Sequence, residues 1–434
     1  MDTLFSHVSI VTMDDRMSVW TDSFLGVTDG KISYLGKKAP EEQPQTIIDG
    51  SGMVLMPGLI NCHTHLPMTI LRGYADDLKL QEWLNDYIFP REAHLDDRAV
   101  KAAAQLAIAE CLRFGVTSVS DMYDHCDAIC QAVAESGIKA NISRGMTMFL
   151  GDEFDFEKFP ACQELVALRD KWQGYDNGRI KIEASVHAEY TSTYQLWDAL
   201  AEFSINEKLG MQVHLSETKR EHDECVEKYG LTPAQLLDCH HLFDVPTVAA
   251  HCVWLEDEDF DILKKHNVSV ACCPASNLKL ASGYANIPKM LEKGINIALG
   301  TDGAASNNNL NILQDIYLFG VVYKGFYHDS TLLTPAQVLH TATRAGALSQ
   351  GRTDCGKLAV GYKADLCVID TDTPQFTPMT DAACNVVYAA QGADVRLTMV
   401  DGEVLYRDGE FKTIDIEKVK AETQKRTDAI LRRL

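Results

Sequence analysis

The sequence contains no apolar run that approaches the ~18 residues of a membrane-spanning helix. It also contains no Cys-x-x-Cys spacing, although 13 cysteines are scattered through its apolar segments. That odd number and that scatter argue against a disulfide framework and a structural zinc site, and they predict reduced, buried thiols. The first residues, Met1 to Leu4, carry no basic region ahead of an apolar stretch, so we expect no signal peptide. These absences together predict a cytoplasmic protein without a membrane partner.

Positive charge is scarce as well. A formal net charge of -22 argues against nucleic acid and anionic membrane surfaces as partners. Three common motifs are missing, namely His-Glu-x-x-His, the Walker A loop and the dinucleotide-binding Gly-x-Gly-x-x-Gly. Residues 187–189 match the His-x-Glu of cytidine-deaminase-type enzymes, but the Pro-Cys-x-x-Cys that accompanies it is missing. Residues 272–274 come nearest to that second motif and have the wrong spacing.

The chain does contain a long, regular alternation of apolar strands and helices. Its 434 residues suit a barrel-sized domain with a smaller one beside it. Alternation of this kind predicts a parallel sheet, and eight strands close a TIM-type barrel, so we predict an α/β fold with a (β/α)8 barrel. After an opening strand from residue 55, strands are expected at about residues 116–120, 138–143, 180–186, 211–215, 247–250, 268–272 and 295–299. Helices are expected at residues 98–113, 128–135, 194–208, 257–265 and 287–293.

The two flanks of this block have a different texture. Residues 1–54 and 355–410 carry short alternating segments separated by Asp-Gly turns. Because both flanks share this texture, we predict that they meet as one small β-sandwich domain beside a barrel of residues 55–354. Residues 411–434 are expected to form a C-terminal helix capped by Asp415.

Histidines and carboxylates gather at the predicted strand ends. His63 and His65 are separated by one residue, so in an extended chain both side chains point to the same side and can face one metal ion. Catalytic residues of a TIM-type barrel come from the C-terminal ends of its strands. A core histidine satisfied by the backbone is the usual alternative for any one position, but it is hard to sustain for five of the 14 histidines together. We therefore predict a metal site. The residues at these ends are His63, His65, Arg144, His187, His214, Glu217, His251 and Asp302.

Five segments carry a resemblance to a known family. Residues 57–65 are Pro-Gly-Leu-Ile-Asn-Cys-His-Thr-His, residues 71–77 are Leu-Arg-Gly-Tyr-Ala-Asp-Asp, and residues 214–218 are His-Leu-Ser-Glu-Thr. Residues 300–306 are Gly-Thr-Asp-Gly-Ala-Ala-Ser, and residues 360–366 are Val-Gly-Tyr-Lys-Ala-Asp-Leu. Over essentially its whole length, the chain resembles the amidohydrolase superfamily and, within it, the cytosolic deaminases of 5′-methylthioadenosine and S-adenosylhomocysteine.

The resemblance implies a metal centre and its catalytic residues. One divalent metal per chain, usually zinc, is implied at His63, His65, His214 and Asp302. Because four protein ligands exceed the three of the usual catalytic zinc, iron and manganese stay open. His251 would orient a water whose pKa falls to roughly 7 in such sites. Asp302 would help to take its proton during attack on C6 of the adenine ring, and Glu217 would protonate N1.

The resemblance also implies substrate contacts at Trp83, Glu92, Arg144, His187, Glu217 and Ser306. Glu92 would bind the ribose hydroxyls, His187 would contact the base, and Trp83 would line the pocket. A solvated carboxylate at Glu92 and a core aromatic at Trp83 fit the sequence equally well. Arg144 ends an apolar strand, where a buried guanidinium needs a partner, and in the family it contacts the far end of the nucleoside.

These residues predict metal-dependent hydrolytic deamination of an adenosine-type nucleoside with a modified 5′ position. The candidates are 5′-methylthioadenosine, S-adenosylhomocysteine, 5′-deoxyadenosine and adenosine, and a homo-oligomer stays open. A deaminase of guanine or another N-heterocycle and a triazine-type chlorohydrolase share the metal residues, so both stay open. A non-catalytic scaffold is disfavoured because Glu217 and Asp302 are both present.

The 5′ group is where the chain departs from its relatives. Some family members place a second arginine shortly after the one matched by Arg144, and the two clamp the carboxylate of S-adenosylhomocysteine. Here the next cations are Lys158 and Arg169. The nearby carboxylates, which would repel that of the substrate, are Asp152, Glu153 and Asp155. The side chains expected to suit a thioether or methyl group are Met146, Met148 and Phe149. We therefore predict that neutral 5′ groups are preferred over S-adenosylhomocysteine by about tenfold or more in kcat/KM.

Overall fold

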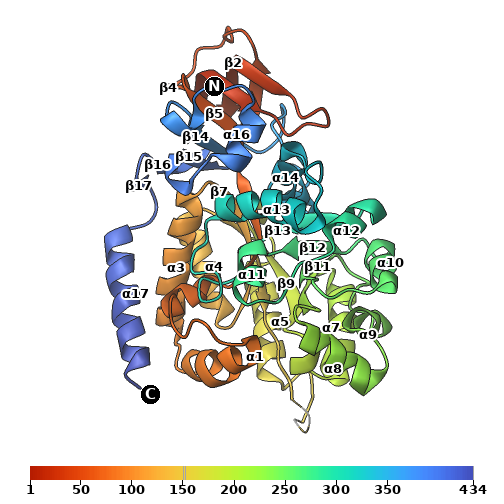
Figure 1. Ribbon diagram of the computed structural model, residues 1–434. Helices are drawn as coiled ribbons and strands as arrows, with labels where there is room; N and C mark the ends of the chain where they lie inside the picture. Colours follow the sequence, from red (N-terminus) through yellow and green to blue (C-terminus); the bar gives the residue numbers. More distant parts are fainter. Residues whose placement is uncertain (150, 152, 434) are drawn as a thin grey trace.

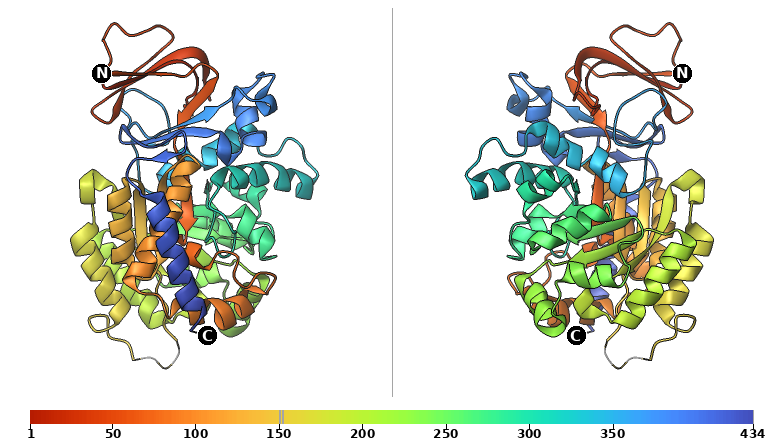
Figure 2. Two further views of the ribbon diagram at one scale, coloured as in Figure 1. Left: turned by 90° about the vertical axis from the view of Figure 1, so that its left-hand side faces the viewer. Right: turned by 90° about the vertical axis from the view of Figure 1, so that its right-hand side faces the viewer.

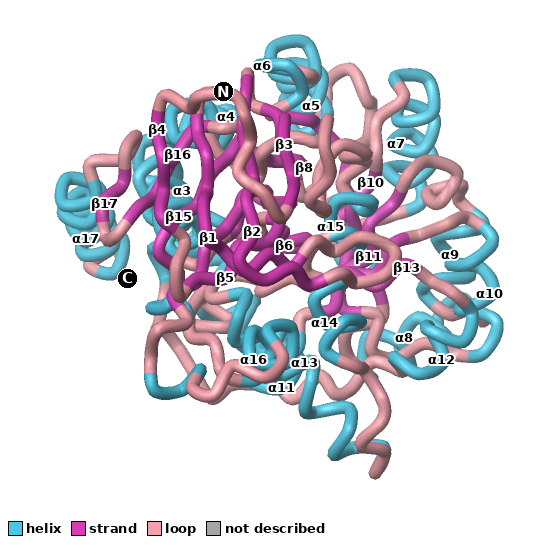
Figure 3. Tube along the Cα trace, turned by 90° about the horizontal axis from the view of Figure 1, so that it is seen from above, coloured by secondary structure: helices cyan, strands magenta, loops and turns pink. Residues whose placement is uncertain are grey.

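An eight-stranded parallel sheet makes up the centre of the molecule. The computed structural model describes residues 1–149, 151 and 153–433. The strand order is β13-β12-β11-β10-β9-β8-β7-β6, and every pair is parallel. Helices surround these strands (Figures 1 and 3), so the predicted (β/α)8 barrel is confirmed. The strands are β6 (Leu59–Thr64), β7 (Val116–Tyr123), β8 (Lys139–Arg144), β9 (Ile180–Val186), β10 (Met211–Leu215), β11 (Thr247–His251), β12 (Ser269–Cys272) and β13 (Asn296–Leu299).

The barrel strands are apolar because both of their faces are covered. Every residue of β7, β10 and β11 is buried, as expected for parallel strands between a barrel core and outer helices. The five predicted helices are all present. The longer helices are α3 (Asp97–Arg113), α4 (Cys126–Ser136), α5 (Pro160–Trp172), α7 (Tyr194–Glu207), α8 (Lys219–Tyr229), α9 (Pro233–Cys239), α10 (Asp257–Lys265), α11 (Pro274–Lys279), α12 (Ile287–Lys293), α13 (Ile312–Tyr327), α14 (Pro335–Thr341), α15 (Arg344–Ser349) and α16 (Ala382–Tyr388).

Short helical turns fill several loops. After β6 the chain forms a 3₁₀ turn (Leu66–Leu71), α1 (Leu80–Glu82), a π turn (Trp83–Ile88) and α2 (Phe89–Glu92). The others are α6 (Tyr175–Gly178) and the 3₁₀ turns Glu189–Thr191, Pro374–Phe376 and Gly392–Asp394.

The first and last barrel strands, β6 and β13, meet at a seam. The side-chain amide of Asn61 donates to Thr301 Oγ1 (2.7 Å), and the backbone N–H of Thr301 donates back to Asn61 Oδ1 (3.0 Å). One residue further on, the N–H of Asp302 donates to the carbonyl of His63 (3.0 Å). A Cβ at Gly300 would lie 2.8 Å from the Cβ of His63, so only glycine allows this approach. The seam brings together residues 240 positions apart in the chain.

Strands from both chain ends form a second, mixed sheet. Its order is β17-β16-β15-β14-β5-β1-β2-β3, with β4 beside β1. This sheet lies at the end of the barrel where β6 begins, and α1 lies at the opposite end (Figure 1). The strands are β1 (Thr3–Val11), β2 (Val19–Thr28), β3 (Lys31–Gly36), β4 (Thr46–Asp49), β5 (Met53–Pro57), β14 (Leu366–Asp370), β15 (Val395–Val400), β16 (Glu403–Arg407) and β17 (Glu410–Phe411).

The helix α17 (Ile416–Leu431) runs along the outside of the barrel beside α3 (Figure 2). Asp415 caps it as predicted, because its side chain accepts from the N–H of Lys418 at 3.1 Å. Thr427 Oγ1 donates to the carbonyl of Ile70 (2.9 Å), which ties the helix to the loop after β6. Leu434, included in the predicted helix, lies outside the described residues. None of the described helices is long and apolar enough to cross a membrane.

Candidate active site

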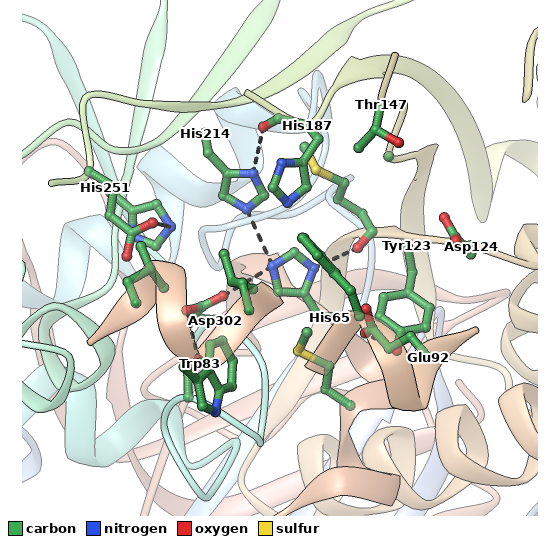
Figure 4. Close-up of a pocket in the computed structure, with 18 of the residues that line it drawn as sticks. His65, Trp83, Glu92, Tyr123, Asp124, Thr147, His187, His214, His251 and Asp302 are labelled. Atoms are coloured by element: carbon green, nitrogen blue, oxygen red, sulfur yellow. Dashed lines mark hydrogen bonds and ion pairs between the residues drawn. The ribbon is translucent and has the colours of Figure 1, made fainter. Parts of the chain in front are cut away.

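Four imidazoles and one carboxylate converge at the C-terminal ends of four barrel strands. Their ligand atoms form two overlapping triplets, each within 4.8 Å, namely His63, His65 and His214, and His63, His251 and Asp302. The Nε2 atom of His65 lies 3.3 Å from Nε2 of His214 and 3.2 Å from Oδ1 of Asp302 (Figure 4). The structure thus brings together the four residues that the family resemblance assigned to one metal. They are His63, His65, His214 and Asp302, and the first and last are 239 positions apart in the sequence. This His/Asp group can hold a metal ion.

Backbone carbonyls orient two of these rings. His65 Nδ1 lies 2.6 Å from the carbonyl of Met122, and His214 Nδ1 lies 2.7 Å from the carbonyl of His187. A carbonyl only accepts, so in the neutral rings each Nδ1 carries the proton and each Nε2 presents a lone pair. The buried Nε2 of His63 has no hydrogen-bond partner among the described residues. Inward lone pairs and an unsatisfied buried nitrogen fit a divalent metal.

The protonation states of the rings bear on metal binding. Burial lowers the pKa of His63 to about 4 and that of His214 well below its ordinary value, so both rings are neutral near pH 7. Burial acts the same way on His65, but the Asp302 carboxylate outweighs it and raises the pKa of His65 to about 9. The extra proton on His65 must leave before the ring can act as a ligand, so metal and proton compete for this site.

Asp302 is held in place by two hydroxyls and a strained backbone. Ser276 Oγ and Ser306 Oγ both donate to its Oδ2 atom, at 2.6 and 2.7 Å, which leaves Oδ1 facing the histidines. Its φ angle is 62°, and that of His251 is 70°. The left-handed region costs a non-glycine residue roughly 1–2 kcal/mol. Such strain is kept where the surrounding contacts fix the backbone, which is common at active sites.

Glu217 lies beside the metal group without joining it. Its Oε1 atom accepts from Ser282 Oγ (3.2 Å), and its Oε2 atom is 3.8 Å from His251 Nε2. The His251 ring is itself oriented by Asn277, whose Oδ1 atom is 2.9 Å from Nδ1. Burial raises the pKa of Glu217 above its ordinary value. A buried carboxyl of this kind is suited to carrying a proton between water and a bound substrate.

A cavity of about 290 Å³ opens over the metal group. It lies at the small end of the ~300–1,000 Å³ typical of small-molecule sites. Five of the predicted substrate residues line it, namely Trp83, Glu92, His187, Glu217 and Ser306. In Figure 4, His251 and Asp302 lie on one side of His65, while Glu92, Tyr123 and Asp124 lie on the other. The cavity therefore extends from the metal group to a far end at Asp124.

The wall of the cavity carries a second carboxyl, that of the half-buried Glu92. The Tyr123 hydroxyl donates to Glu92 Oε1. Burial raises the pKa of Glu92 to about 7, and this hydrogen bond opposes the shift. Glu92 therefore changes its charge near neutral pH.

Known proteins are similar to this chain over the whole barrel. The profile of the amidohydrolase family matches residues 54–405, which contain the whole metal group and cavity. The chain belongs to the amidohydrolase family. A protein of Dictyoglomus thermophilum named 5-methylthioadenosine/S-adenosylhomocysteine deaminase is 42% identical over 402 residues, which cover 93% of each chain. A 5′-deoxyadenosine deaminase of Methanosarcina mazei is 38% identical over 433 residues, which cover 100% of this chain and 99% of that one.

A solved structure is similar along the same length. The crystal structure of an adenosine deaminase from Xanthomonas campestris with bound zinc has a TM-score of 0.93 at 30% identity, and the match covers 99% of both chains. The resemblance inferred from the sequence segments is therefore confirmed at the level of the amidohydrolase family.

In this amidohydrolase, Arg144 already has partners. Its Nε atom donates to Glu164 Oε2 (2.8 Å), and its Nη1 atom contacts Asp124 and the carbonyl of Gly145 (2.5 Å). The described residues that line the cavity include Asp124 and Gly145 but not Arg144. Two carboxylates therefore hold the guanidinium that the family resemblance assigned to the far end of a nucleoside.

The segment after β8 exposes a different set of side chains from the one expected. Thr147 and Phe149 line the cavity. Met146 and Met148 are buried behind the wall, where Met146 Sδ is 4.0 Å from Cys162 Sγ and Met148 Sδ accepts from Thr193 Oγ1 (3.4 Å). The prediction that these two methionines contact a thioether is therefore wrong, because alternate residues of an extended segment face opposite sides.

The other cations considered for the 5′ group are paired elsewhere in this amidohydrolase. Lys158 is 82% exposed and lies 2.6 Å from Asp155, and Arg169 lies 2.7 Å from Asp170. Within the described part of the chain, neither cation lines the cavity. Asp152, which the sequence predicted to repel a carboxylate, lies outside the described residues.

Sequence reasoning missed four residues of the site. Ser276 and Asn277 follow β12, and Tyr123 and Asp124 lie at the end of β7. These are the two barrel strands to which the sequence analysis assigned no site residue. Catalytic residues of barrel enzymes lie at the C-terminal ends of the strands. Applying this rule to the ends of β7 and β12 as well would have identified these residues.

Proposed function

We propose that this amidohydrolase removes ammonia from an adenosine-type nucleoside with a modified 5′ position and forms the inosine analogue. The observation that carries the proposal is the placement of Glu217 beside a His/Asp metal group on the floor of a cavity that also contains Glu92. The printed names of the 38–42% identical relatives support the same substrate class. The unpaired, mostly buried cysteines support a cytoplasmic location.

We propose that the metal is zinc, one ion per chain, held by His63, His65, His214 and Asp302. The nitrogen-rich ligand set suits zinc, and iron and manganese accept the same ligands. The zinc of the Xanthomonas campestris structure supports this choice. When bound, such a metal lowers the pKa of a water molecule to roughly 7, which supplies a nucleophile at neutral pH.

Three side chains then move or direct the protons. His251, oriented by Asn277, would hydrogen-bond a water in the site, and Asp302 would accept the proton of that water as its oxygen bonds to C6. Glu217 delivers a proton to N1, which stabilises the tetrahedral adduct. The proton taken up by Asp302 would pass to the 6-amino group, which leaves as ammonia as the C6–N bond breaks, and the proton of the new C6 hydroxyl would return to Glu217.

The remaining residues hold the substrate. We assign the ribose hydroxyls to Glu92, the base to His187, and the packing against the nucleoside to Trp83, which is buried in the cavity wall. Ser306 acts as a positioning residue, because its hydroxyl donates to Asp302. Arg144 acts on the far end of the cavity only through Asp124.

Ammonia release from adenosine, 5′-methylthioadenosine, 5′-deoxyadenosine, S-adenosylhomocysteine and guanine tests the proposal. We expect turnover of the adenosine-type nucleosides, with kcat/KM for the neutral 5′ groups exceeding that for S-adenosylhomocysteine by about tenfold or more, because Arg144 is already paired. Turnover of guanine alone would identify a different N-heterocycle deaminase. A clear preference for S-adenosylhomocysteine would contradict the pairing described for Arg144.

The substrate affinity should depend on pH through Glu92. Because burial raises the pKa of Glu92 to about 7, the neutral acid predominates below that pH and the carboxylate above it. Only the carboxylate accepts two ribose hydroxyl protons, so kcat/KM for adenosine should fall as the pH drops through 7, at up to about tenfold per unit. The pH profile of kcat/KM checks this.

A matched substrate and a matched variant serve as controls. A 2′,3′-dideoxy analogue lacks both hydroxyls, so its kcat/KM should not show this acid limb, the fall as the pH drops through 7. Glu92→Gln should lose the same limb with adenosine. If wild type and Glu92→Gln share one profile, the limb belongs to another group.

A further inference from the structure

The far end of the cavity carries a negative charge that is not balanced. Asp124 lines the cavity, and its side chain is 55% exposed. Arg144 is bound on one side by Asp124 and on the other by Glu164. Two carboxylates therefore share one guanidinium. Asp124 lines the cavity in which a nucleoside would lie, while Arg144 and Glu164 line an adjoining pocket that has Asp124 in its wall as well.

Apart from Arg144, which Asp124 shares with Glu164, the described residues that line the cavity offer Asp124 no lysine or arginine. His125 lines it, but its Nδ1 atom is 2.7 Å from the carboxylate of Asp97. The neighbouring wall residues Gly145 and Thr147 are neutral. Figure 4 places Asp124 on the side of His65 away from His251, where the end of a nucleoside distant from the reacting ring would lie.

We propose that Asp124 is a specificity-determining residue that selects nucleosides by the charge of the 5′ substituent, favouring an ammonium group over a neutral one and a neutral one over a carboxylate. This inference rests on the proposed function and names the substrate class of the same site. An ammonium group donates a charge-assisted hydrogen bond to the carboxylate of Asp124. A carboxylate meets a like charge, and the charge of Arg144 that would offset it is already shared by Asp124 and Glu164.

The expected size of the selection is moderate. About half of the Asp124 side chain is exposed, so water screens its charge. We expect about tenfold in kcat/KM for each step of the order, the size of one charge-assisted contact. Because the effect is electrostatic and partly exposed, it should shrink when the salt concentration is raised.

Three adenosine thioethers of nearly equal size test the inference. They carry a 5′-(2-aminoethyl)thio, a 5′-propylthio or a 5′-(carboxymethyl)thio group, which are cationic, neutral and anionic. For the wild-type protein we expect kcat/KM to fall in that order. The reverse order would overturn the inference whatever the variants do. Calorimetric dissociation constants rank the same three compounds without turnover, so a failure of the proposed deamination is distinguishable from a failure of the charge selection.

Two variants separate Asp124 from its neighbours. Asp124→Asn should lower kcat/KM for the aminoethyl compound about tenfold, raise it for the carboxymethyl compound by a similar factor, and change it less than threefold for the propyl compound. Glu164→Gln also removes one carboxylate from Arg144 but leaves Asp124 in the cavity wall, so its effects should be much smaller. Equal shifts in both variants would assign the selection to Arg144 instead. A uniform change for all three compounds in Asp124→Asn would show a purely structural role.

Discussion

Removal of the metal should abolish ammonia release. The Nε2 atom of His63 is buried without a hydrogen-bond partner among the described residues, and the rings of His65 and His214 are oriented by carbonyls so that their Nε2 atoms face the same point. A metal bound there would lower the pKa of a water molecule to roughly 7 and so supply the nucleophile. Dialysis against a chelator should therefore remove activity, and elemental analysis of active protein should show close to one divalent metal per chain.

Histidine variants check that the metal sits where we place it. His214→Ala removes one predicted ligand and should lose both metal and activity. His266→Gln is the matched control. The Nε2 atom of His266 lies 2.7 Å from Asp238 Oδ1, and His266 is not among the described residues that line the cavity, so this variant should keep its metal content. Restoring activity by adding zinc, iron or manganese to the chelated protein then ranks the metals. Full activity in protein free of transition metals would refute the metal site.

Replacing Glu217 with glutamine should lower kcat by ~10²–10⁴-fold, the range of a general acid–base residue. Glutamine keeps the size of the side chain and the acceptor for Ser282, but it cannot take up and release a proton. Glu217 is not a member of either ligand triplet, so the metal content should not change. Steady-state kinetics and elemental analysis on the same preparation measure both quantities.

Glu183, a buried carboxyl outside the cavity lining, provides the control for the loss of a buried charge. The buried carboxylate of Glu183 accepts hydrogen bonds from the side-chain amides of Asn141 and Gln212, each at 2.7 Å. Glu183 is not one of the described residues that line the cavity. Glu183→Gln should therefore lower stability while kcat changes less than about threefold. Loss of metal in Glu217→Gln, or an equal loss of kcat in Glu183→Gln, would contradict the role given to Glu217.

The barrel and the convergence of the candidate metal residues were predictable because they depend on local patterns. Apolar strands separated by helices define the barrel, and the His63-Thr64-His65 spacing places two rings on one side of a strand. The position of a residue at the end of a strand is also local, so His214, His251 and Asp302 could be assigned before their partners were known.

The far end of the cavity was not predictable, because it depends on contacts between distant segments. Arg144 is bound by Asp124 and Glu164, each 20 positions away, and no sequence pattern shows that these carboxylates reach it. Whether Met146 or Thr147 faces the cavity depends on the register of this segment against β9. In the structure, Met146 forms a parallel β-bridge with Val186 of β9. A shift of one residue exchanges the two faces of an extended segment.

The seam between β6 and β13 has a consequence for how the finished protein acquires its metal. Asn61 and Thr301 lie 240 positions apart. At ~5–20 residues per second, a ribosome therefore makes Thr301 roughly 12–48 s after Asn61. In the first part of that interval, before His214 is made, His63 and His65 are only a pair of nitrogens, which bind divalent metals by intrinsic affinity and without a fixed geometry. Asp302 joins them only when the last strand closes the barrel. The complete set of candidate ligands therefore exists only once the barrel has closed, so we expect the closed barrel to set the choice of metal.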